Sequence, residues 1–129
     1  MSTIPIPITA IFVALLALML VAVSVRVTVL RASKKINFFD GGDEELGRAI
    51  RVQGNFIEYV PMALALMGLV EWLGAKPWIV YLMGIALLLA RIVHAWGLYA
   101  GAFQGRVIGT TVNWIVLAGG GLLLLGLVV

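Results

Sequence analysis

Residues 48–61 read RAIRVQGNFIEYVP and place charged and polar side chains where a long apolar run begins. On a helix that turns about 100° per residue, they share one stripe roughly 100° wide: Arg48, Arg51, Asn55, Glu58 and Tyr59, with Met62 beside them. Charged groups on a helix that enters lipid are costly unless they meet partners or a ligand. The stripe is therefore typical of a binding site. The alternative is a salt-bridge network that only holds helices together.

The composition is that of an integral membrane protein. Of 129 residues, 63% are hydrophobic and 12% are charged, against about 45–50% and about 25% in soluble globular proteins. The absence of cysteine excludes a disulfide framework and a cysteine nucleophile, and with a single histidine no metal site is expected. The small net charge of +3 is clustered beside one span. It bears on membrane orientation rather than on nucleic-acid binding, which we do not expect.

Four apolar stretches predict four membrane-spanning helices in a single domain over residues 1–129. Their expected ranges are about 4–31, 44–73, 77–99 and 106–128. The predicted fold class is therefore all-α: a four-helix transmembrane bundle.

The connections carry turn and capping signals. Asp40-Gly41-Gly42 predicts a turn between the first two helices, and Asp43 is placed to cap the second helix. Residues 101–106, GAFQGR, predict the turn before the fourth helix, whose Gly119, Gly120, Gly121 and Gly126 favour close helix approach.

Basic residues are distributed unevenly between the two ends of such a bundle. Arg31, Lys34, Lys35 and Arg106 lie at one end, and Lys76 lies at the other. The positive-inside rule places the first end in the cytoplasm and both termini on the opposite side. The polar stripe is then expected to face the cytoplasm.

The pattern R-x-x-R-x-x-x-N-x-x-E-Y followed by proline, over residues 48–61, resembles the second-helix motif of the MAPEG superfamily. These are the membrane-associated proteins in eicosanoid and glutathione metabolism, and the likeness is greatest to a small bacterial branch, which suggests a bacterial inner membrane. The resemblance implies a homotrimer that binds glutathione between subunits near the cytoplasmic face. A lipophilic acceptor would enter such a site from the membrane lipid.

The resemblance also implies roles for individual residues. Arg51, Asn55, Glu58 and Tyr59 match the glutathione-binding motif, and Gln53 falls where some relatives use a polar contact. Arg31 matches an arginine that reaches the site from a neighbouring subunit.

Further likeness lies in the third and fourth helices. Arg91 and His94 resemble an R-x-x-H motif whose histidine lies beside the ligand, although a snorkelling arginine and an interhelical histidine are the alternative. Arg106 corresponds to an arginine near the thiol, in an altered local sequence, and Leu98 replaces a family tyrosine.

The chemistry of the residues agrees with a glutathione site. Glutathione has two carboxylates, one ammonium group and one thiol, which call for planar cations and an acidic group. Arg48 or Arg51, Gln53, Asn55 and Glu58 supply such groups. A further cation would favour the thiolate, which is the nucleophile, and Arg31 and Arg106 are the candidates.

We expect a glutathione transferase or peroxidase that acts on lipophilic electrophiles or lipid hydroperoxides. The alternative is a non-catalytic lipid-binding or scaffold protein of the same fold. A small exporter of cationic drugs is disfavoured, because such proteins need an acidic group deep in the bilayer and the first span has none.

Overall fold

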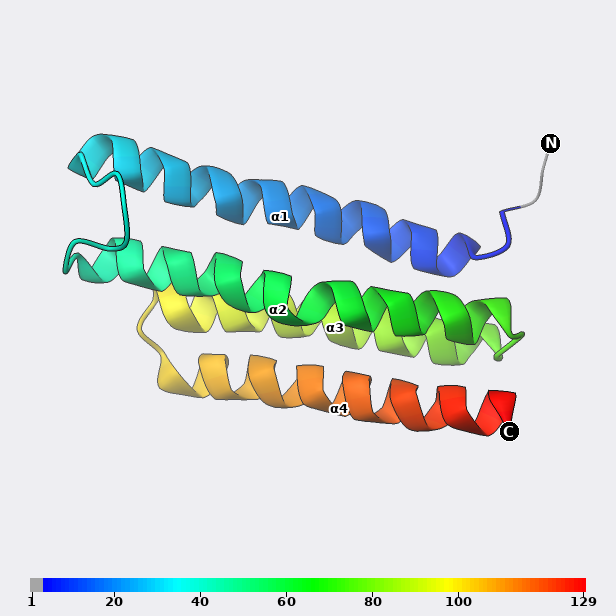
Figure 1. The fold of residues 1–129 in the computed structure, drawn as a ribbon. Coiled ribbons are helices and arrows are strands. Elements are labelled where there is room, and N and C mark those ends of the chain that lie inside the picture. Colours follow the sequence, from blue (N-terminus) through cyan, green and yellow to red (C-terminus); the bar gives the residue numbers. More distant parts are fainter. Residues whose placement is uncertain (1–3) are drawn as a thin grey trace.

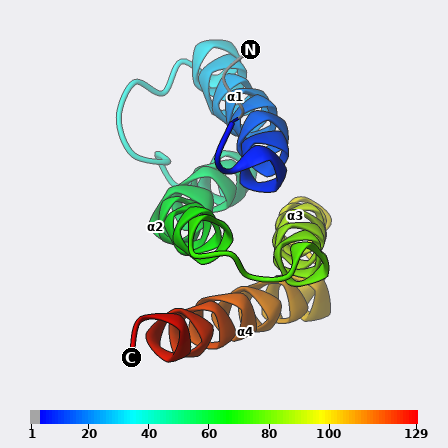
Figure 2. The ribbon, with the colours of Figure 1, turned by 90° about the vertical axis from the view of Figure 1, so that its right-hand side faces the viewer.

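The computed structural model describes residues 4–129, so the first three residues of the predicted domain 1–129 lie outside it. This part of the chain forms four α-helices and no strand, as predicted: α1 Pro7–Lys34, α2 Glu44–Trp72, α3 Pro77–Tyr99 and α4 Phe103–Val128. The helices lie in three layers, with α1 on one side, α2 and α3 in the middle, and α4 on the other side (Figures 1 and 2). Because α1 and α4 each pack on α2 and α3 but not on one another, the α2–α3 pair is the centre of the fold.

Three helices, α1, α3 and α4, are long and apolar enough to cross a membrane by length and composition. The remaining helix, α2, has 29 residues, which gives it a length of about 43 Å at 1.5 Å per residue. It runs beside the others over its whole length (Figure 1), although its first half carries the polar stripe. The fold therefore places charged residues of α2 alongside the apolar helices α1, α3 and α4.

The packing between helices has an apolar centre and a glycine-rich edge. Phe12 and Leu16 of α1 meet Phe56 of α2 and Leu87 of α3 in the largest buried cluster. The helix α4 approaches α3 so closely that a Cβ on Gly105 would lie 2.9 Å from the Cα of Gly97. Small residues at such crossings let helix backbones meet.

The glycines predicted to pack closely in the second half of α4 mostly do not do so within the chain. Gly120 faces Met83 and Leu66, but among residues 4–129 no atom lies within 4 Å of where a Cβ on Gly119, Gly121 or Gly126 would be. The close approach instead uses Gly105 and Gly109, earlier in the helix, because α4 diverges from α3 towards its end (Figure 2).

The bounds of two helices, α1 and α4, differ from the prediction. The helix α1 begins at Pro7, whose ring suits a first turn, and ends where Lys35 adopts a left-handed conformation with φ of 56°. The helix α4 begins at Phe103, so the predicted turn over residues 101–106 is wrong from Phe103 onwards. Gly101, with φ of 68°, makes the turn, whereas Gly105 is helical and serves the contact with α3.

The predicted turn and cap between α1 and α2 are confirmed. Gly41 and Gly42 have φ of 58° and 76°, and the Gly42 N–H donates to Asp40 Oδ1 at 3.0 Å. Asp43 caps α2, because its Oδ1 accepts a hydrogen bond of 2.8 Å from the Leu46 N–H.

The two ends of the bundle carry different connections (Figure 1). The α1–α2 and α3–α4 connections lie at one end, which we call the basic end because Arg31, Lys34, Lys35 and Arg106 lie there. The α2–α3 connection lies at the opposite end, together with the start of α1 and the end of α4.

Candidate functional site

The outer part of the predicted stripe is an exposed ion pair on α2. Arg51 Nη1 lies 3.4 Å from Glu58 Oε1, and the two side chains are 55% and 51% exposed. The pair lies about 10 to 20 Å from the start of the helix, at 1.5 Å per residue. A cation and a carboxylate thus share an open surface in the first half of α2.

The inner part of the stripe is buried. Asn55 is 8% exposed, and its Oδ1 accepts a hydrogen bond of 2.6 Å from Arg91 Nη1. Arg91 is 1% exposed and also donates from Nη2 to the Gly109 carbonyl at 3.2 Å. One guanidinium therefore joins α2, α3 and α4, and both of its acceptors are neutral.

Tyr59 and His94 lie on the α4 side of this junction. The Tyr59 hydroxyl accepts a hydrogen bond of 3.3 Å from Trp114 Nε1. His94 is 2% exposed and packs against Gly109, where a Cβ would lie 2.5 Å from the histidine Cβ. Within one chain, His94 is thus a buried contact between α3 and α4.

Two predicted site residues point elsewhere. Gln53 donates from Nε2 to Ser24 Oγ of α1 at 2.9 Å, and it lies about 200° around α2 from Arg51. Arg31 donates from Nη1 to the Phe39 carbonyl at 2.7 Å and the Ile36 carbonyl at 3.4 Å, in the α1–α2 loop. The fold of one chain does not bring either residue to the Arg51–Glu58 pair.

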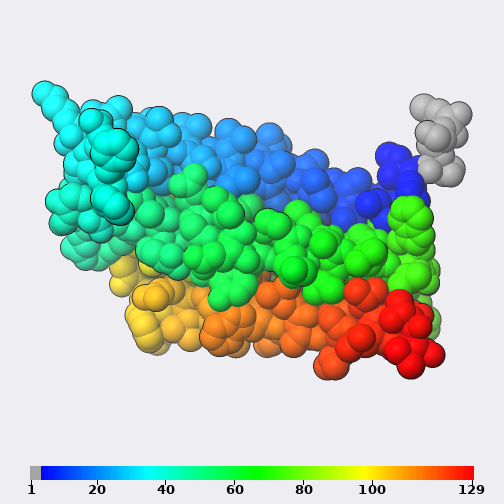
Figure 3. Space-filling view, in the orientation of Figure 1, coloured from blue at the N-terminus to red at the C-terminus, as the bar shows by residue number. Residues whose placement is uncertain are grey.

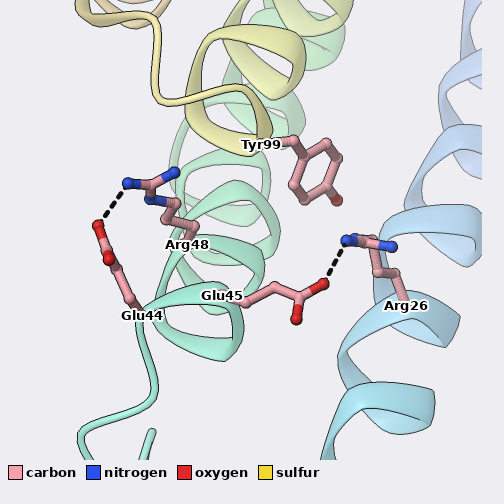
Figure 4. Close-up of a pocket in the computed structure, with 5 residues that line it drawn as sticks. All are labelled: Arg26, Glu44, Glu45, Arg48 and Tyr99. Atoms are coloured by element: carbon pink, nitrogen blue, oxygen red, sulfur yellow. Dashed lines mark hydrogen bonds and ion pairs between the residues drawn. The ribbon is translucent and has the colours of Figure 1, made fainter.

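The basic end contains a charged cavity of about 310 Å³ between α1, α2 and α3. Figure 4 shows the five side chains that line it: Arg26, Glu44, Glu45, Arg48 and Tyr99. Arg26 binds Glu45 at 3.1 Å and lies over the Tyr99 ring, 4.9 Å from its centroid. Arg48 pairs with Glu44 on the opposite wall (Figure 4).

A smaller cavity of about 180 Å³ lies between α2 and the α3–α4 turn. Arg48 and Arg106 both line it, together with Leu98 and Gly101. A Cβ on Gly101 would lie 3.0 Å from Arg48 Nη1. Two predicted site residues that are far apart in the sequence, Arg48 and Arg106, are thus brought to one cavity.

Lys34 connects the end of α1 to the start of α2. Its Nζ lies 2.8 Å from Asp43 Oδ2 and 3.1 Å from Glu45 Oε2. The hydrogen bond from Lys34, with that from the Leu46 N–H, lowers the pKa of Asp43 below its ordinary value of 3.8. Hydrogen bonds to Asp43 and Glu45 raise the pKa of Lys34 above 10.5.

Sequence reasoning missed Tyr99 and the pairing of Glu45. Glu45 lies in the first turn of α2, where Arg26 and Lys34 both bind it. The basic residues at the end of α1 indicated that ion pairs would form there. The sequence alone does not show which acidic residues they bind.

The comparisons with known proteins agree on one family. A model of the MAPEG family matches residues 9–126, which include every predicted site residue. The chain is 38% identical over 110 residues to "Inner membrane protein YecN" of Escherichia coli (strain K12), covering 85% of this chain and 84% of that protein. The protein of the same name from a second Escherichia coli strain matches to the same extent.

Proposed function

This chain belongs to the MAPEG family of integral membrane proteins, and from that premise we propose that it binds glutathione and activates its thiol against lipophilic electrophiles. The observation that carries the proposal is the exposed Arg51–Glu58 pair of α2.

Two opposite charges on an open helix face are costly at membrane depth, unless water, a ligand or another subunit covers them. The pair is also suited to a peptide with both charges. A guanidinium binds a carboxylate through parallel hydrogen bonds, and a carboxylate accepts from an ammonium group. Arg51 would hold a glutathione carboxylate, and Glu58 would hold its amine.

The neighbouring residues would hold and orient this site. Tyr59 would orient the ligand, while behind it Asn55 holds α2 against α3 and His94 packs α3 against α4. Arg31 and Gln53 lie on the α1 side and would reach a glutathione molecule only from a second copy of the chain. A homotrimer with sites between subunits, open to the cytoplasm, meets that requirement.

Arg48 and Arg106 are the proposed cations near the thiol, because they line one cavity. A nearby positive charge favours the thiolate. In conjugation, the sulfur attacks an electrophilic carbon, a C–S bond forms, and the leaving group departs with its electron pair. In peroxide reduction, two glutathione molecules are oxidised to one disulfide while a lipid hydroperoxide is reduced to an alcohol and water.

A second candidate is a non-catalytic lipid-binding or scaffold protein of the same fold. Leu98 favours it, because this apolar side chain lines the Arg48–Arg106 cavity where resembling enzymes have a tyrosine. Turnover of a chromogenic aryl halide with glutathione separates the two candidates, since only the enzyme consumes the thiol.

Calorimetric titration of the detergent-purified protein with glutathione tests the site. We expect saturable binding that weakens at least about tenfold in Arg51→Ala and in Glu58→Ala, because hydrogen bonds to charged groups contribute about 1.5–3 kcal/mol. Lys76→Ala, which removes a charge at the opposite end, is the matched control. No binding by well-folded wild-type protein, or equal binding by all variants, would overturn the proposal.

A further inference from the structure

Two adjacent aromatic side chains stand out from the loop between α1 and α2. Phe38 is 80% exposed and Phe39 is 86% exposed. Ile36, in the same loop, packs against a buried cluster that includes Leu30 and Leu46. The loop therefore divides its apolar side chains, with one facing the bundle and two facing away from it.

The loop is held in shape by contacts of its own. Arg31 Nη1 donates to the carbonyls of Phe39 and Ile36, and a Cβ on Gly41 would lie 3.1 Å from Ile36 Cδ1. Phe39 has a φ of 54°, a left-handed conformation that is unfavourable for an aromatic residue. Backbone strain of this kind persists only where surrounding contacts impose it. The outward position of the rings is thus built into the loop.

The loop lies beside the helices and not across their ends. In the side view, the loop lies at the same position along the helix axes as the last turn of α1 and the first turn of α2 (Figure 1). Seen along the helices, it swings out to the side of the three layers (Figure 2), and its atoms form a block at the basic end in the space-filling view (Figure 3). A loop in this position is at the boundary between lipid and water.

The basic residues beside the loop differ in what they bind. Lys34 pairs with Asp43 and Glu45, and Arg31 is engaged by loop carbonyls. Lys35 is exposed and has no ion pair within residues 4–129. Its charge is left to meet an anion outside the chain.

We propose that the α1–α2 loop is a membrane-surface anchor, in which Phe38 and Phe39 insert at the headgroup boundary and Lys35 binds anionic phospholipid. Phenylalanine is among the apolar side chains that surface-bound segments bury at the boundary between headgroups and acyl chains, and a lysine beside it is attracted to anionic headgroups. The anchor fixes the depth of the basic end, where the charged cavities lie.

The absence of cysteine makes a single-site fluorescence test direct. An environment-sensitive fluorophore is attached to Phe38→Cys or Phe39→Cys, in vesicles of phosphatidylethanolamine with a minor share of phosphatidylglycerol. Leu18→Cys, on the exposed face of α1, is the mid-membrane reference, and Asn37→Cys is the polar control in the same loop. We expect quenching at positions 38 and 39 by lipids with a nitroxide near the headgroup. We also expect Leu18→Cys to respond to a nitroxide deep in the acyl chain, and Asn37→Cys to respond to aqueous iodide.

Two outcomes overturn the proposal. Quenching of both phenylalanine positions by iodide but not by nitroxide lipids would place the loop in water. Shielding from both quenchers, with disulfide cross-linking of unlabelled Phe39→Cys chains, would show that a second copy covers the rings.

The lysine is tested separately, in labelled Phe38→Cys with and without Lys35→Gln. We expect phosphatidylglycerol to increase headgroup-nitroxide quenching over vesicles that contain only phosphatidylcholine, and Lys35→Gln to abolish that increase. An unchanged increase would remove Lys35 from the anchor.

Discussion

Arg91 Nη1 donates a hydrogen bond of 2.6 Å to Asn55 Oδ1 at a fully buried contact between α2 and α3. The same guanidinium binds the Gly109 carbonyl, so one side chain fixes three helices. The asparagine of the polar motif therefore has a structural partner, whereas Arg51 and Glu58 remain exposed. The motif combines an inner residue that positions α2 with outer residues that form an exposed ion pair.

Asn55→Leu is expected to lower the free energy of unfolding by about 3 kcal/mol, the upper range for a hydrogen bond to a charged group, because it leaves the buried guanidinium without its side-chain acceptor. Arg91→Met is expected to cost about 1–3 kcal/mol, since it leaves only a neutral amide unpaired. Thermal unfolding in detergent measures both.

The double variant Asn55→Leu with Arg91→Met is the control for this pair. It removes both polar groups, so we expect it to be more stable than Asn55→Leu. Additive losses would show that Arg91 does not depend on Asn55.

Gly109→Ala and Gly97→Ala are expected to destabilise the protein by about 1–3 kcal/mol each, because the added methyl group overpacks a close helix crossing. At Gly109 a Cβ would lie 2.6 Å from the Ala90 carbonyl oxygen, and at Gly97 it would lie 2.6 Å from the Gly105 carbonyl carbon. Backbone atoms cannot move aside as a flexible side chain can.

Gly119→Ala is the matched control on α4, because in the described part of the chain no atom lies within 4 Å of where its Cβ would be. Alanine is a better helix former than glycine by about 1 kcal/mol, so we expect unchanged or higher stability. Equal losses at positions 109 and 119 would contradict the tight α3–α4 crossing.

Local signals predicted much of the fold. Asp43 before two glutamates specified the start of α2, and Asp40-Gly41-Gly42 specified the turn before it. Such signals work because cap and turn geometry depend on a few neighbouring residues. The long apolar stretches predicted the number and approximate ranges of the helices for the same kind of reason.

The inward and outward parts of the polar stripe could not be predicted in this way. Asn55 and Arg51 are about 40° apart around α2, so the sequence places both on one face. Their different burial depends on where α3 and α4 lie, and the partner of Asn55 is Arg91, 36 residues away. Helix periodicity gives the direction of a side chain but not the helix that it meets.

The Lys34–Asp43 pair predicts how stability depends on pH. The pKa of Asp43 is lowered, so its contribution is present above its ordinary value of 3.8 and is lost as the pH falls through the lowered pKa. The pKa of Lys34 is raised, so its contribution is present below 10.5 and is lost as the pH rises through the raised pKa. We expect the thermal midpoint to decrease at both extremes.

Asp43→Asn isolates the acid side of this dependence, because asparagine still caps a helix but carries no charge. Wild-type protein should be more stable than the variant above pH 3.8, and the difference should decrease below it. A difference that is constant with pH would mean that the carboxylate is not bound to Lys34 in solution.

Glu71 is expected to hold the start of α1, at the end opposite the candidate site. Its two carboxylate oxygens accept hydrogen bonds of 2.8 Å and 2.7 Å from the N–H groups of Ile8 and Thr9. Because α1 has no side-chain cap of its own, Glu71→Ala should cost about 2 kcal/mol, the upper range for a helix cap or a charge at a helix terminus. Glu71→Gln should cost less, since its amide oxygen still accepts one hydrogen bond.

Hydrogen exchange at Ile8 and Thr9 should become faster in both Glu71 variants. Glu44→Gln, which alters an exposed ion pair at the other end of α2, is the control and should leave exchange at these two amides unchanged. Unchanged exchange at both amides in Glu71→Ala would show that α1 begins without help from α2.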